Sequence, residues 1–245
     1  MTVFYVPSGG SINLAIGQAS DGDTILVSNG VFNEDVVINK NRLRIIGEGM
    51  GKTILNGMRS IPGVNGLQID ATLVFITELS VTNYRQNGIL INTDHNIIRN
   101  VKVLYNNDHG IRIEGDGNLI IETEFSLNGS ETDGGGIEVN GTYNYVIHCR
   151  CNHNFSNGIS FNGANNVALD NTVENNNGDG FNINGENSLF INNVSRTNND
   201  AGIDLVSKQN LLFKNKFNDN TNGEIELNEL NHNLMWKNEV DDKND

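Results

Sequence analysis

The feature that most constrains the fold is a turn sequence that returns every 22 residues. The segment "NGISFNG" at residues 157–163 is followed by "DGFNING" at residues 179–185. Eight successive repeats carry an apolar residue at the same position, and every interval is 22 residues except one of 26. A fixed period of this length is the sequence signature of a solenoid. The aligned residues are Leu67, Ile89, Ile111, Ile137, Ile159, Phe181, Ile203 and Ile225.

Each repeat predicts two or three short strands. Two residues after each aligned position stands a second apolar residue, and seven of the eight residues between them are polar, which is the alternation of a half-buried strand. A second strand follows, with apolar pairs such as Leu119/Ile121 and Tyr145/Ile147 that we expect to face inward. Arg99 interrupts this inward column, which indicates either a slip of register or a bulge at Arg99.

A unit this small cannot bury its apolar face alone, so the repeats must stack on one another. The sequence therefore predicts an all-β fold, a right-handed, single-stranded parallel β-helix with coils of about 22 residues. Asparagine columns support stacked corners, because carboxamides can satisfy buried turn backbone. One expected column is Asn96, Asn118, Asn144, Asn166, Ser188, Asn210 and His232, and a second is Asn171, Asn193 and Asn215.

The chain is expected to form one domain over residues 1–245. Residues 1–60 would provide the N-terminal cap and first coils, residues 61–240 the regular coils, and residues 241–245 a frayed tail. Ser11 precedes apolar residues at helical spacing up to Ala19, which predicts a short helix that covers the first coil. Strands are expected at residues 24–27, 36–38 and 42–46.

Charge and hydropathy exclude some partners. The formal net charge is −14, so the clustered cations that bind nucleic acid or acidic lipid are missing. No apolar run is long enough to cross a membrane, and the N-terminal sequence lacks the layout of a signal peptide. We therefore expect neither nucleic-acid binding nor membrane insertion.

The opening of the chain resembles the pectin-lyase-like superfamily of right-handed β-helices. The resemblance rests on "YVPSGGSINLAIGQASDGDTILVSNGVFNEDVVINKNRLRIIGEGMGKTILNG" at residues 5–57 and on the later "NGIxI"-type repeats. The resemblance covers nearly the whole chain. The proteins it resembles include pectate lyases, alginate C5-epimerases and periplasmic copper-binding β-helix proteins. The resemblance implies a secreted or cell-surface protein that interacts with a polysaccharide or other glycan. It fixes the fold more firmly than the chemistry, because function depends on a few groups on the outer face.

One turn resembles a catalytic segment of alginate epimerases. Residues 105–110 read "YNNDHG", close to the Tyr-Gly-x-Asp-Pro-His segment of those enzymes, but without its proline and with the histidine one residue early. The resemblance implies that Tyr105 and His109 transfer protons, that Asp108 orients them and that Arg112 meets a uronate carboxylate. The plainer interpretation is that these residues are the turn of the repeat, since "NNNGDG" recurs at residues 175–180.

The single long repeat points to a binding surface. Its four additional residues fall in "SLNGSETDGGG" at residues 126–136, and insertions in solenoids often build the binding face. One interpretation is that Glu131 and Asp133 bind calcium through their carboxylate oxygens. The other is that they belong to an acidic loop that is simply solvated. Four outward residues are candidates for contact with substrate: Glu138, His148, Arg150 and Asp170.

The segment "HCRCNH" at residues 148–153 superficially resembles a metal site. Strand parity places both Cys149 and Cys151 inside and His148 outside, which favours buried, reduced thiols. Two classes of function remain. One is a lyase or C5-epimerase acting on an acidic polysaccharide, with calcium as a candidate cofactor. The other is a noncatalytic surface or appendage module that binds glycans or protein partners.

Overall fold

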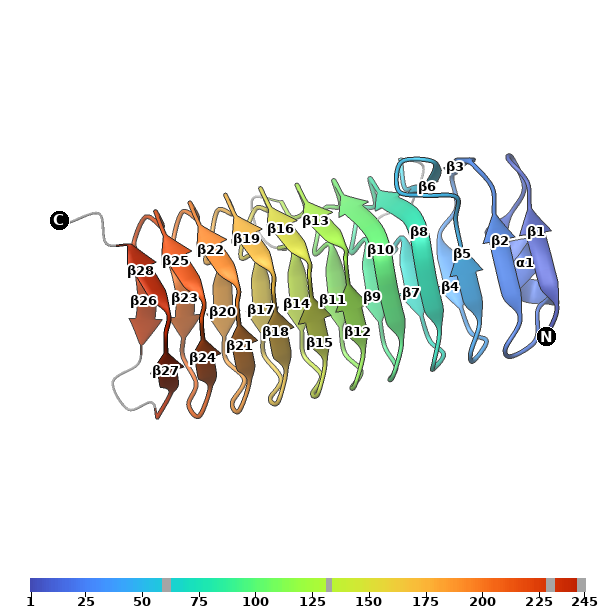
Figure 1. Ribbon diagram of the computed structural model, residues 1–245. Helices are drawn as coiled ribbons and strands as arrows, with labels where there is room; N and C mark the ends of the chain where they lie inside the picture. Colours follow the sequence, from blue (N-terminus) through green and yellow to red (C-terminus); the bar gives the residue numbers. More distant parts are fainter. Residues whose placement is uncertain (59–62, 131–133, 228–231, 242–245) are drawn as a thin grey trace.

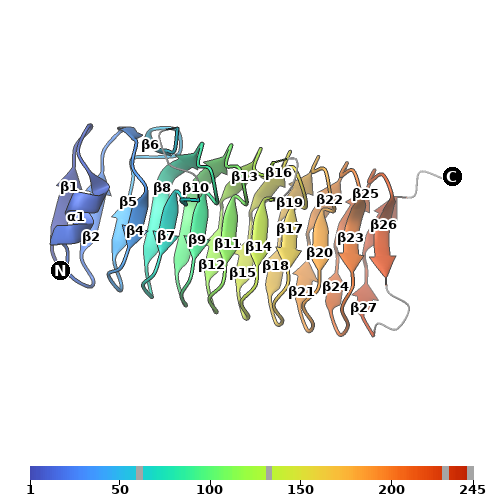
Figure 2. The same ribbon diagram turned by 180° about the vertical axis from the view of Figure 1, so that it is seen from behind.

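The computed structural model describes residues 1–58, 63–130, 134–227 and 232–241, and it is a parallel β-solenoid of about ten coils. The coils stack in one row from the N-terminus to the C-terminus (Figures 1 and 2). The predicted repeat is confirmed by the pairing register, since Ile159 lies beside Ile137 on one side and Phe181 on the other. The 26-residue interval is confirmed by the pairing of Ile111 with Ile137.

One side of the solenoid is a nine-stranded parallel sheet. Its strands read apolar–polar–apolar in most coils, and the outer two side chains of each triplet are buried. The strands are β4 (Val36–Ile38), β7 (Leu67–Ile69), β9 (Ile89–Ile91), β11 (Ile111–Ile113), β14 (Ile137–Val139), β17 (Ile159–Phe161), β20 (Phe181–Ile183), β23 (Ala201–Leu205) and β26 (Gly223–Leu227).

The other strands form one bent sheet made of two stacks, joined by β8 (Phe75–Thr82) and β10 (Ile97–Leu104), which run through both. Stack 1 also contains β1 (Val3–Val6), β2 (Thr24–Val27), β5 (Arg44–Ile46), β12 (Leu119–Ile121), β15 (Tyr145–Ile147), β18 (Val167–Leu169), β21 (Leu189–Ile191), β24 (Leu211–Phe213) and β27 (Leu234–Trp236). Stack 2 also contains β3 (Gly30–Phe32), β6 (Thr53–Asn56), β13 (Glu124–Ser126), β16 (Arg150–Asn152), β19 (Thr172–Glu174), β22 (Val194–Arg196), β25 (Lys216–Asn218) and β28 (Glu239–Asp241).

The predicted N-terminal helix is confirmed as α1 (Ile12–Gln18), whose N-cap is Ser11. Ile12, Ala15 and Ile16 are buried, and α1 packs against β1, β2 and β4, so it covers the first coil. The carboxylate of Glu34 accepts hydrogen bonds from the Ile12 N–H at 2.6 Å and the Ser11 hydroxyl at 2.8 Å. Among the described residues, no helix has the length and apolar character required to span a membrane.

The prediction of which residues of stack 1 face inward was wrong. The middle residue of each triplet is buried, as at Ile120, Val146 and Ala168, while the flanking apolar residues face outward. All three residues are apolar, so the alternation contains no polar residue that would set its phase. The outward residues form what we call the apolar strip: Phe75, Ile97, Leu119, Ile121, Tyr145, Ile147, Val167, Leu169, Leu189, Ile191, Leu211, Phe213, Leu234 and Trp236.

Arg99 therefore points outward, and its register with Thr77 and Ile121 is regular. Its Nε lies 2.8 Å from a carboxylate oxygen of Glu122. The chain turns immediately after it, because one residue per coil adopts a positive φ between stacks 1 and 2. This corner column, with φ between 51° and 61°, contains Glu78, Asn100, Glu122, His148, Asp170, Asn192, Lys214 and Lys237.

Buried asparagines close the corners. Both predicted columns are confirmed, with one correction: Asn233 rather than His232 continues from Asn210, because the last coil is one residue longer. The Asn171 column also extends to Asn238. The structure adds a third column, which the sequence analysis did not identify, at the corner between stack 2 and the nine-stranded sheet: Asn106, Asn128, Asn154, Asn176, Asn198 and Asn220.

Asn176 shows how one such amide connects three coils. Its Oδ1 accepts hydrogen bonds from the backbone N–H and the side chain of Asn154, at 3.0 and 2.9 Å. Its Nδ2 donates to the Cys151 carbonyl at 3.2 Å and to Asn198 at 3.0 Å. Main-chain groups at this buried corner would otherwise have no partner.

Replacing Asn176 with Leu should lower the free energy of unfolding by about 3 kcal/mol or more. The substitution leaves the Asn154 N–H and the Cys151 carbonyl buried and unpaired, and each such group costs about 1–3 kcal/mol. The control is Asn177→Ala, which removes a neighbouring exposed amide and should change stability by less than about 0.5 kcal/mol. Chemical denaturation measures both, and equal midpoints for the two variants would contradict the proposed role of the column.

Both cysteine thiols should react with a thiol reagent only when the protein unfolds. Cys149 and Cys151 are buried and free, as predicted, and burial raises the pKa of the Cys149 thiol to about 12. Reaction requires the thiolate, so both exclusion from solvent and the raised pKa slow it. The extent of thiol labelling should rise together with unfolding as denaturant is added. Rapid labelling of the folded protein would refute the inward placement of the two cysteines.

Candidate functional site

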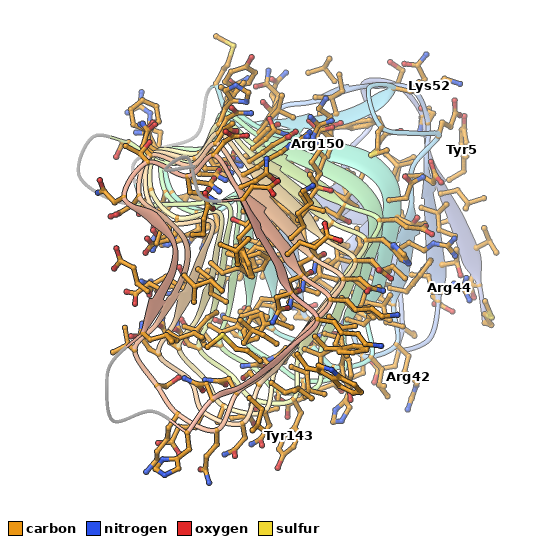
Figure 3. The ribbon with its side chains drawn as sticks, turned by 60° about the vertical axis from the view of Figure 1, so that its left-hand side comes forward. Tyr5, Arg42, Arg44, Lys52, Tyr143 and Arg150 are labelled. Atoms are coloured by element: carbon orange, nitrogen blue, oxygen red, sulfur yellow. The ribbon has the colours of Figure 1, made fainter. Side chains whose placement is uncertain are left out.

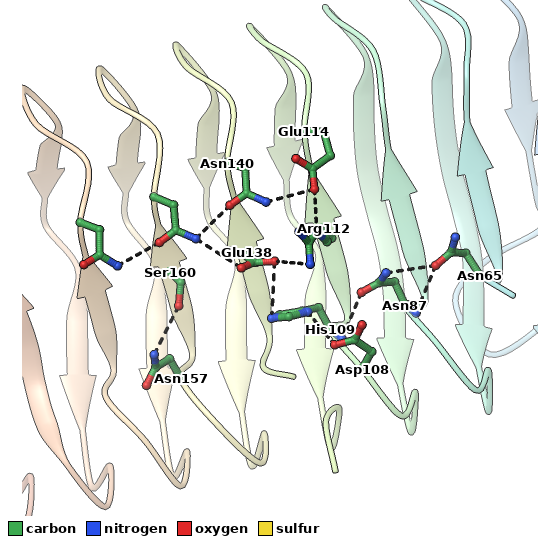
Figure 4. A network of polar contacts seen from close by, with 12 residues as sticks. Asn65, Asn87, Asp108, His109, Arg112, Glu114, Glu138, Asn140, Asn157 and Ser160 are labelled. Carbon is green, nitrogen blue, oxygen red and sulfur yellow. Dashed lines mark hydrogen bonds and ion pairs between the residues drawn. The ribbon is translucent and has the colours of Figure 1, made fainter. Parts of the chain in front are cut away.

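The outer face of the nine-stranded sheet carries a cluster of ionisable side chains around β11 and β14 (Figure 4). His109 Nδ1 lies 2.8 Å from Asp108 Oδ1, and its Nε2 lies 3.7 Å from Glu138 Oε2. The same oxygen of Glu138 lies 3.2 Å from Arg112 Nη1, and Arg112 Nε lies 2.6 Å from Glu114 Oε1. Glu138 therefore joins the histidine and the arginine into one network.

Stacking of coils brings these residues together. Arg112 is the middle residue of β11 and pairs with Glu138 of β14, while Ile111 and Ile113 turn inward and fix the direction of the Arg112 side chain. His109 stands in the turn before β11, where its backbone N–H donates to Asn87 Oδ1 at 3.2 Å. Its own side chain is mostly buried, with 13% of it exposed. The imidazole is thus held between two carboxylates.

The insertion of the long coil ends against this turn. Gly134 has a φ of +92°, and a Cβ atom at this position would lie 2.6 Å from the backbone carbonyl carbon of Asp108. Only a glycine fits so close to the neighbouring main chain. The backbone of the insertion therefore packs directly beside Asp108.

The cluster shifts the proton affinities of its members. The hydrogen bond from His109 lowers the pKa of Asp108 despite its partial burial. The bond to Glu114 raises the pKa of Arg112 further. Burial alone would raise the pKa of Glu114, but hydrogen bonds from Arg112 and Asn140 outweigh this effect and lower it. Asp108 and Glu114 are therefore carboxylates, and Arg112 a cation, at neutral pH.

A polar row continues from the cluster along successive coils. Asn140 donates to Glu114 at 3.0 Å, Asn162 donates to Asn140 at 2.9 Å, and Asn184 donates to Asn162 at 2.9 Å. Asn162 also donates to Glu138 at 3.2 Å. The sequence analysis did not identify this row, although each member stands directly after a strand of the 22-residue repeat. We call it the outer amide row: Glu114, Asn140, Asn162 and Asn184.

The other predicted catalytic residue, Tyr105, lies on a different face. It is 54% exposed and lines an open groove of about 420 Å³ outside stack 2, together with Ile54, Thr82 and Leu104. Its φ of 58° marks the corner that separates it from the turn carrying Asp108 and His109. The structure therefore brings together Asp108, His109 and Arg112 and places Tyr105 apart from them.

The predicted substrate contacts are also divided. Glu138 belongs to the cluster, whereas His148 and Asp170 lie in the corner column, with 3.7 Å between His148 Nε2 and an Asp170 oxygen. Arg150 lies on the outer side of stack 2 (Figure 3). It is bonded to the nearly buried carboxylate of Glu174. Glu131 and Asp133, the predicted calcium ligands, lie outside the described residues. Within the described ranges, no group of three or more His, Cys, Asp or Glu side chains is placed to hold a metal ion.

A second ionisable group lies further along the same face. Asp179 is buried, accepting hydrogen bonds from the Ala201 N–H at 3.0 Å and from Asn182 at 3.0 Å. Burial raises its pKa to about 6, and the charges of Asp200 and Asp204 raise it as well, although the hydrogen bonds oppose the shift. Asp179 therefore changes charge close to neutral pH.

The fold and the site together define a parallel β-helix with a polar outer face. The sequence of residues 64–221 matches the family model described as the right-handed β-helix region. The chain belongs to this family, which also confirms the predicted handedness. No curated protein matches the sequence significantly.

Solved structures share the fold at low sequence identity. The pectate lyase Pel9A superposes with a TM-score of 0.75 at 14% identity, covering 100% of this chain and 78% of Pel9A. ORF18 of Geobacillus virus E2 gives 0.73 at 15% identity, covering 97% of this chain and 62% of the viral protein. The alginate lyase AlyGC gives 0.61 at 16% identity, covering 87% of this chain and 38% of AlyGC. These likenesses establish the architecture.

Replacing Asp179 with Asn should remove a pH-dependent destabilisation. A folded-state pKa raised from 3.8 to about 6 gives stability that is present below pH 3.8 and is lost as the pH rises through 6. The variant should therefore gain up to about 3 kcal/mol over the natural protein at pH 7.5 and match it near pH 4. Asn157 occupies the equivalent position one coil earlier and is uncharged, so an asparagine side chain should also fit at position 179. Denaturant unfolding at both pH values checks this, and a gain that is equal at both would contradict it.

Proposed function

We propose that this protein binds a glycan along the outer face of the nine-stranded sheet, with the Asp108–His109–Arg112–Glu138 cluster as the centre of the site. The observation that supports this most is the junction of that cluster with the outer amide row, which runs along consecutive coils. A linear row of polar groups suits a linear polymer better than a compact ligand.

The chemistry of the face suits sugars. Amide side chains both donate and accept hydrogen bonds, and carboxylates accept them, so the row matches the hydroxyl groups of a polysaccharide. Coils are about 4.8 Å apart, so a chain lying along the solenoid would meet a new set of groups at each coil. Proteins with this architecture include a pectate lyase, an alginate lyase and a pectin methylesterase, which act on polysaccharides.

A second candidate function is proton-transfer catalysis on an acidic polysaccharide, by a lyase or a C5-epimerase. The position of His109 favours it, since Asp108 accepts from Nδ1 and would leave Nε2 as the basic nitrogen. The base would remove the proton next to a uronate carboxylate while Arg112 neutralises that carboxylate. Arg112 already bonds to Glu114 and Glu138, so a uronate would have to replace one of these partners. Calcium held by Glu131 and Asp133 would reduce the repulsion between the acidic protein, with its formal charge of −14, and the carboxylates of the polysaccharide.

Glycan binding is the function that the geometry supports better. Arg112 and both neighbouring glutamates already satisfy one another, and Tyr105, the predicted proton donor, lies on another face. Asn140 uses one of its two N–H donors for Glu114 and one oxygen lone pair for Asn162, so it can still bond to a polymer. A C5 epimerisation also needs a second acid or base on the opposite side of the sugar carbon.

Arg112→Ala and His109→Gln should each weaken binding of pectate or alginate oligosaccharides about tenfold or more, the equivalent of one charge-assisted hydrogen bond. Arg99→Ala is the matched control. Arg99 also pairs with a glutamate, but its side chain lies on the outer face of stack 1, away from the proposed site. Calorimetric titration with and without calcium gives the affinities. Ultraviolet absorbance detects unsaturated ends, and proton NMR in D₂O detects exchange at C5.

Binding that is lost in both site variants and kept in Arg99→Ala supports the proposal. New unsaturated ends or C5 exchange, abolished in His109→Gln, would establish the catalytic candidate instead of simple binding. Equal affinities in all three variants would remove the cluster from the site. Absence of binding to every acidic oligosaccharide tested would refute an acidic glycan as ligand.

A further inference from the structure

The outer face of stack 1 is an apolar surface on an otherwise acidic protein. The apolar strip has one column of side chains that runs through eight coils and a second that runs through the last six, since Thr77 and Arg99 begin that column. The residues beneath them, such as Val146 and Phe190, fill the core. Tyr145 is 43% exposed, Leu189 37%, Leu234 69% and Trp236 63%. These side chains stand outside the sheet, where no described segment of the chain covers them.

The strand sequences of stack 1 differ from those of the other two sides. The nine-stranded sheet places Arg112, Glu138 and Asp204 outward, and stack 2 places Glu124, Arg150 and Lys216 outward. Stack 1 instead reads LII, YVI, VAL, LFI and LLF. A parallel strand that is apolar at every position is typical of a sheet covered on both faces.

The strip is large enough to form the apolar core of an interface. Eight coils at about 4.8 Å and strands of three residues at about 3.3 Å give a strip of about 35 by 10 Å in outline. This outline is about half of the roughly 800 Å² that each partner contributes to a standard interface, so the strip would be its apolar core and the flanking corners its rim. Contiguous apolar patches of this size mark interaction sites.

We infer that the apolar strip is the interface of a homodimer, in which stack 1 of one copy packs face to face on stack 1 of another. The strip is flat and repeats at the coil spacing, and the surface that matches such a repeat is a second sheet with the same repeat. Two sheets packed this way lie about 10 Å apart. This interface leaves the nine-stranded sheet open, so it does not depend on the proposed function.

Charges in the corner column indicate the orientation of the two copies. Glu78 and Glu122 lie in the N-terminal part of the column, and Lys214 and Lys237 end it. A two-fold axis along the strand direction places corner column against corner column with the solenoids antiparallel. The Glu78 end of one column then faces the Lys214 and Lys237 end of the other, while Glu122 remains paired with Arg99 of its own chain. The formal charge of −14 makes an acidic membrane surface a poor alternative, since the two would repel.

Sedimentation equilibrium tests the inference directly. The natural protein should be a dimer, and the association should strengthen with added salt, because two copies of charge −14 repel each other at low ionic strength. Tyr145→Glu, near the middle of the strip, should raise the dissociation constant about a hundredfold or more. The matched control is Tyr105→Glu, which changes a similarly exposed tyrosine outside stack 2 and should leave the dimer intact.

Leu189→Lys serves as a second disrupting variant, and circular dichroism confirms that each variant is folded. Monomers in both strip variants and a dimer in the control support the inference. A natural protein that stays monomeric at about 100 µM, or a dimer that neither strip variant weakens, would overturn it. Cosedimentation of a monomer with phosphatidylcholine vesicles would overturn the homodimer in favour of a lipid surface.

Discussion

Each coil of this solenoid depends on its neighbours for hydrogen bonds that its own corner residues cannot make. The chain turns at buried corners, where main-chain N–H and C=O groups are not paired within the strands. Side-chain amides of the next coil accept from these N–H groups, as Asn193 does for Asn171 at 2.9 Å. The bond forms only when an asparagine occupies the equivalent corner position of the next coil. Each corner therefore fixes the repeat length. The four-residue insertion is tolerated because it leaves this contact in place, with Asn154 accepting from Asn128 across 26 residues.

This dependence explains why the sequence predicts the architecture so fully. Hydrogen bonds between coils demand identical spacing, and identical spacing is visible without a structure. The strands of the nine-stranded sheet were placed correctly because a polar residue such as Arg112 or Glu138 separates two apolar ones. In stack 1 the same reasoning failed, since Leu119, Ile120 and Ile121 are all apolar and the pattern has two possible phases. The phase is set by the positive φ of the corner residue Glu122, a backbone property that composition does not reveal.

The candidate site was predictable only in part for a related reason. Asp108 and His109 are sequence neighbours, and Arg112 follows on the next strand, so their proximity could be expected. Glu138 joins them because β14 stacks on β11, and its place in the cluster depends on the register across the long coil. Tyr105 was grouped with His109 by sequence distance, but Tyr105 itself stands at a corner, with a φ of 58°, and its side chain lies on another face. Sequence distance thus misleads wherever a solenoid turns.

The inward columns are fixed by packing and by the amide columns, so differences among β-helices must lie in the outward residues. In this chain the three sides differ in kind. The nine-stranded sheet presents a polar row whose members bond to one another, and stack 2 presents mixed charges, among them Glu174 between Arg150 and Arg196. From β12 onward, stack 1 presents aliphatic side chains and aromatic rings. Burial of one side against a second copy would leave the polar row facing solvent on each copy, so association and glycan binding would take place on separate sides of the same scaffold.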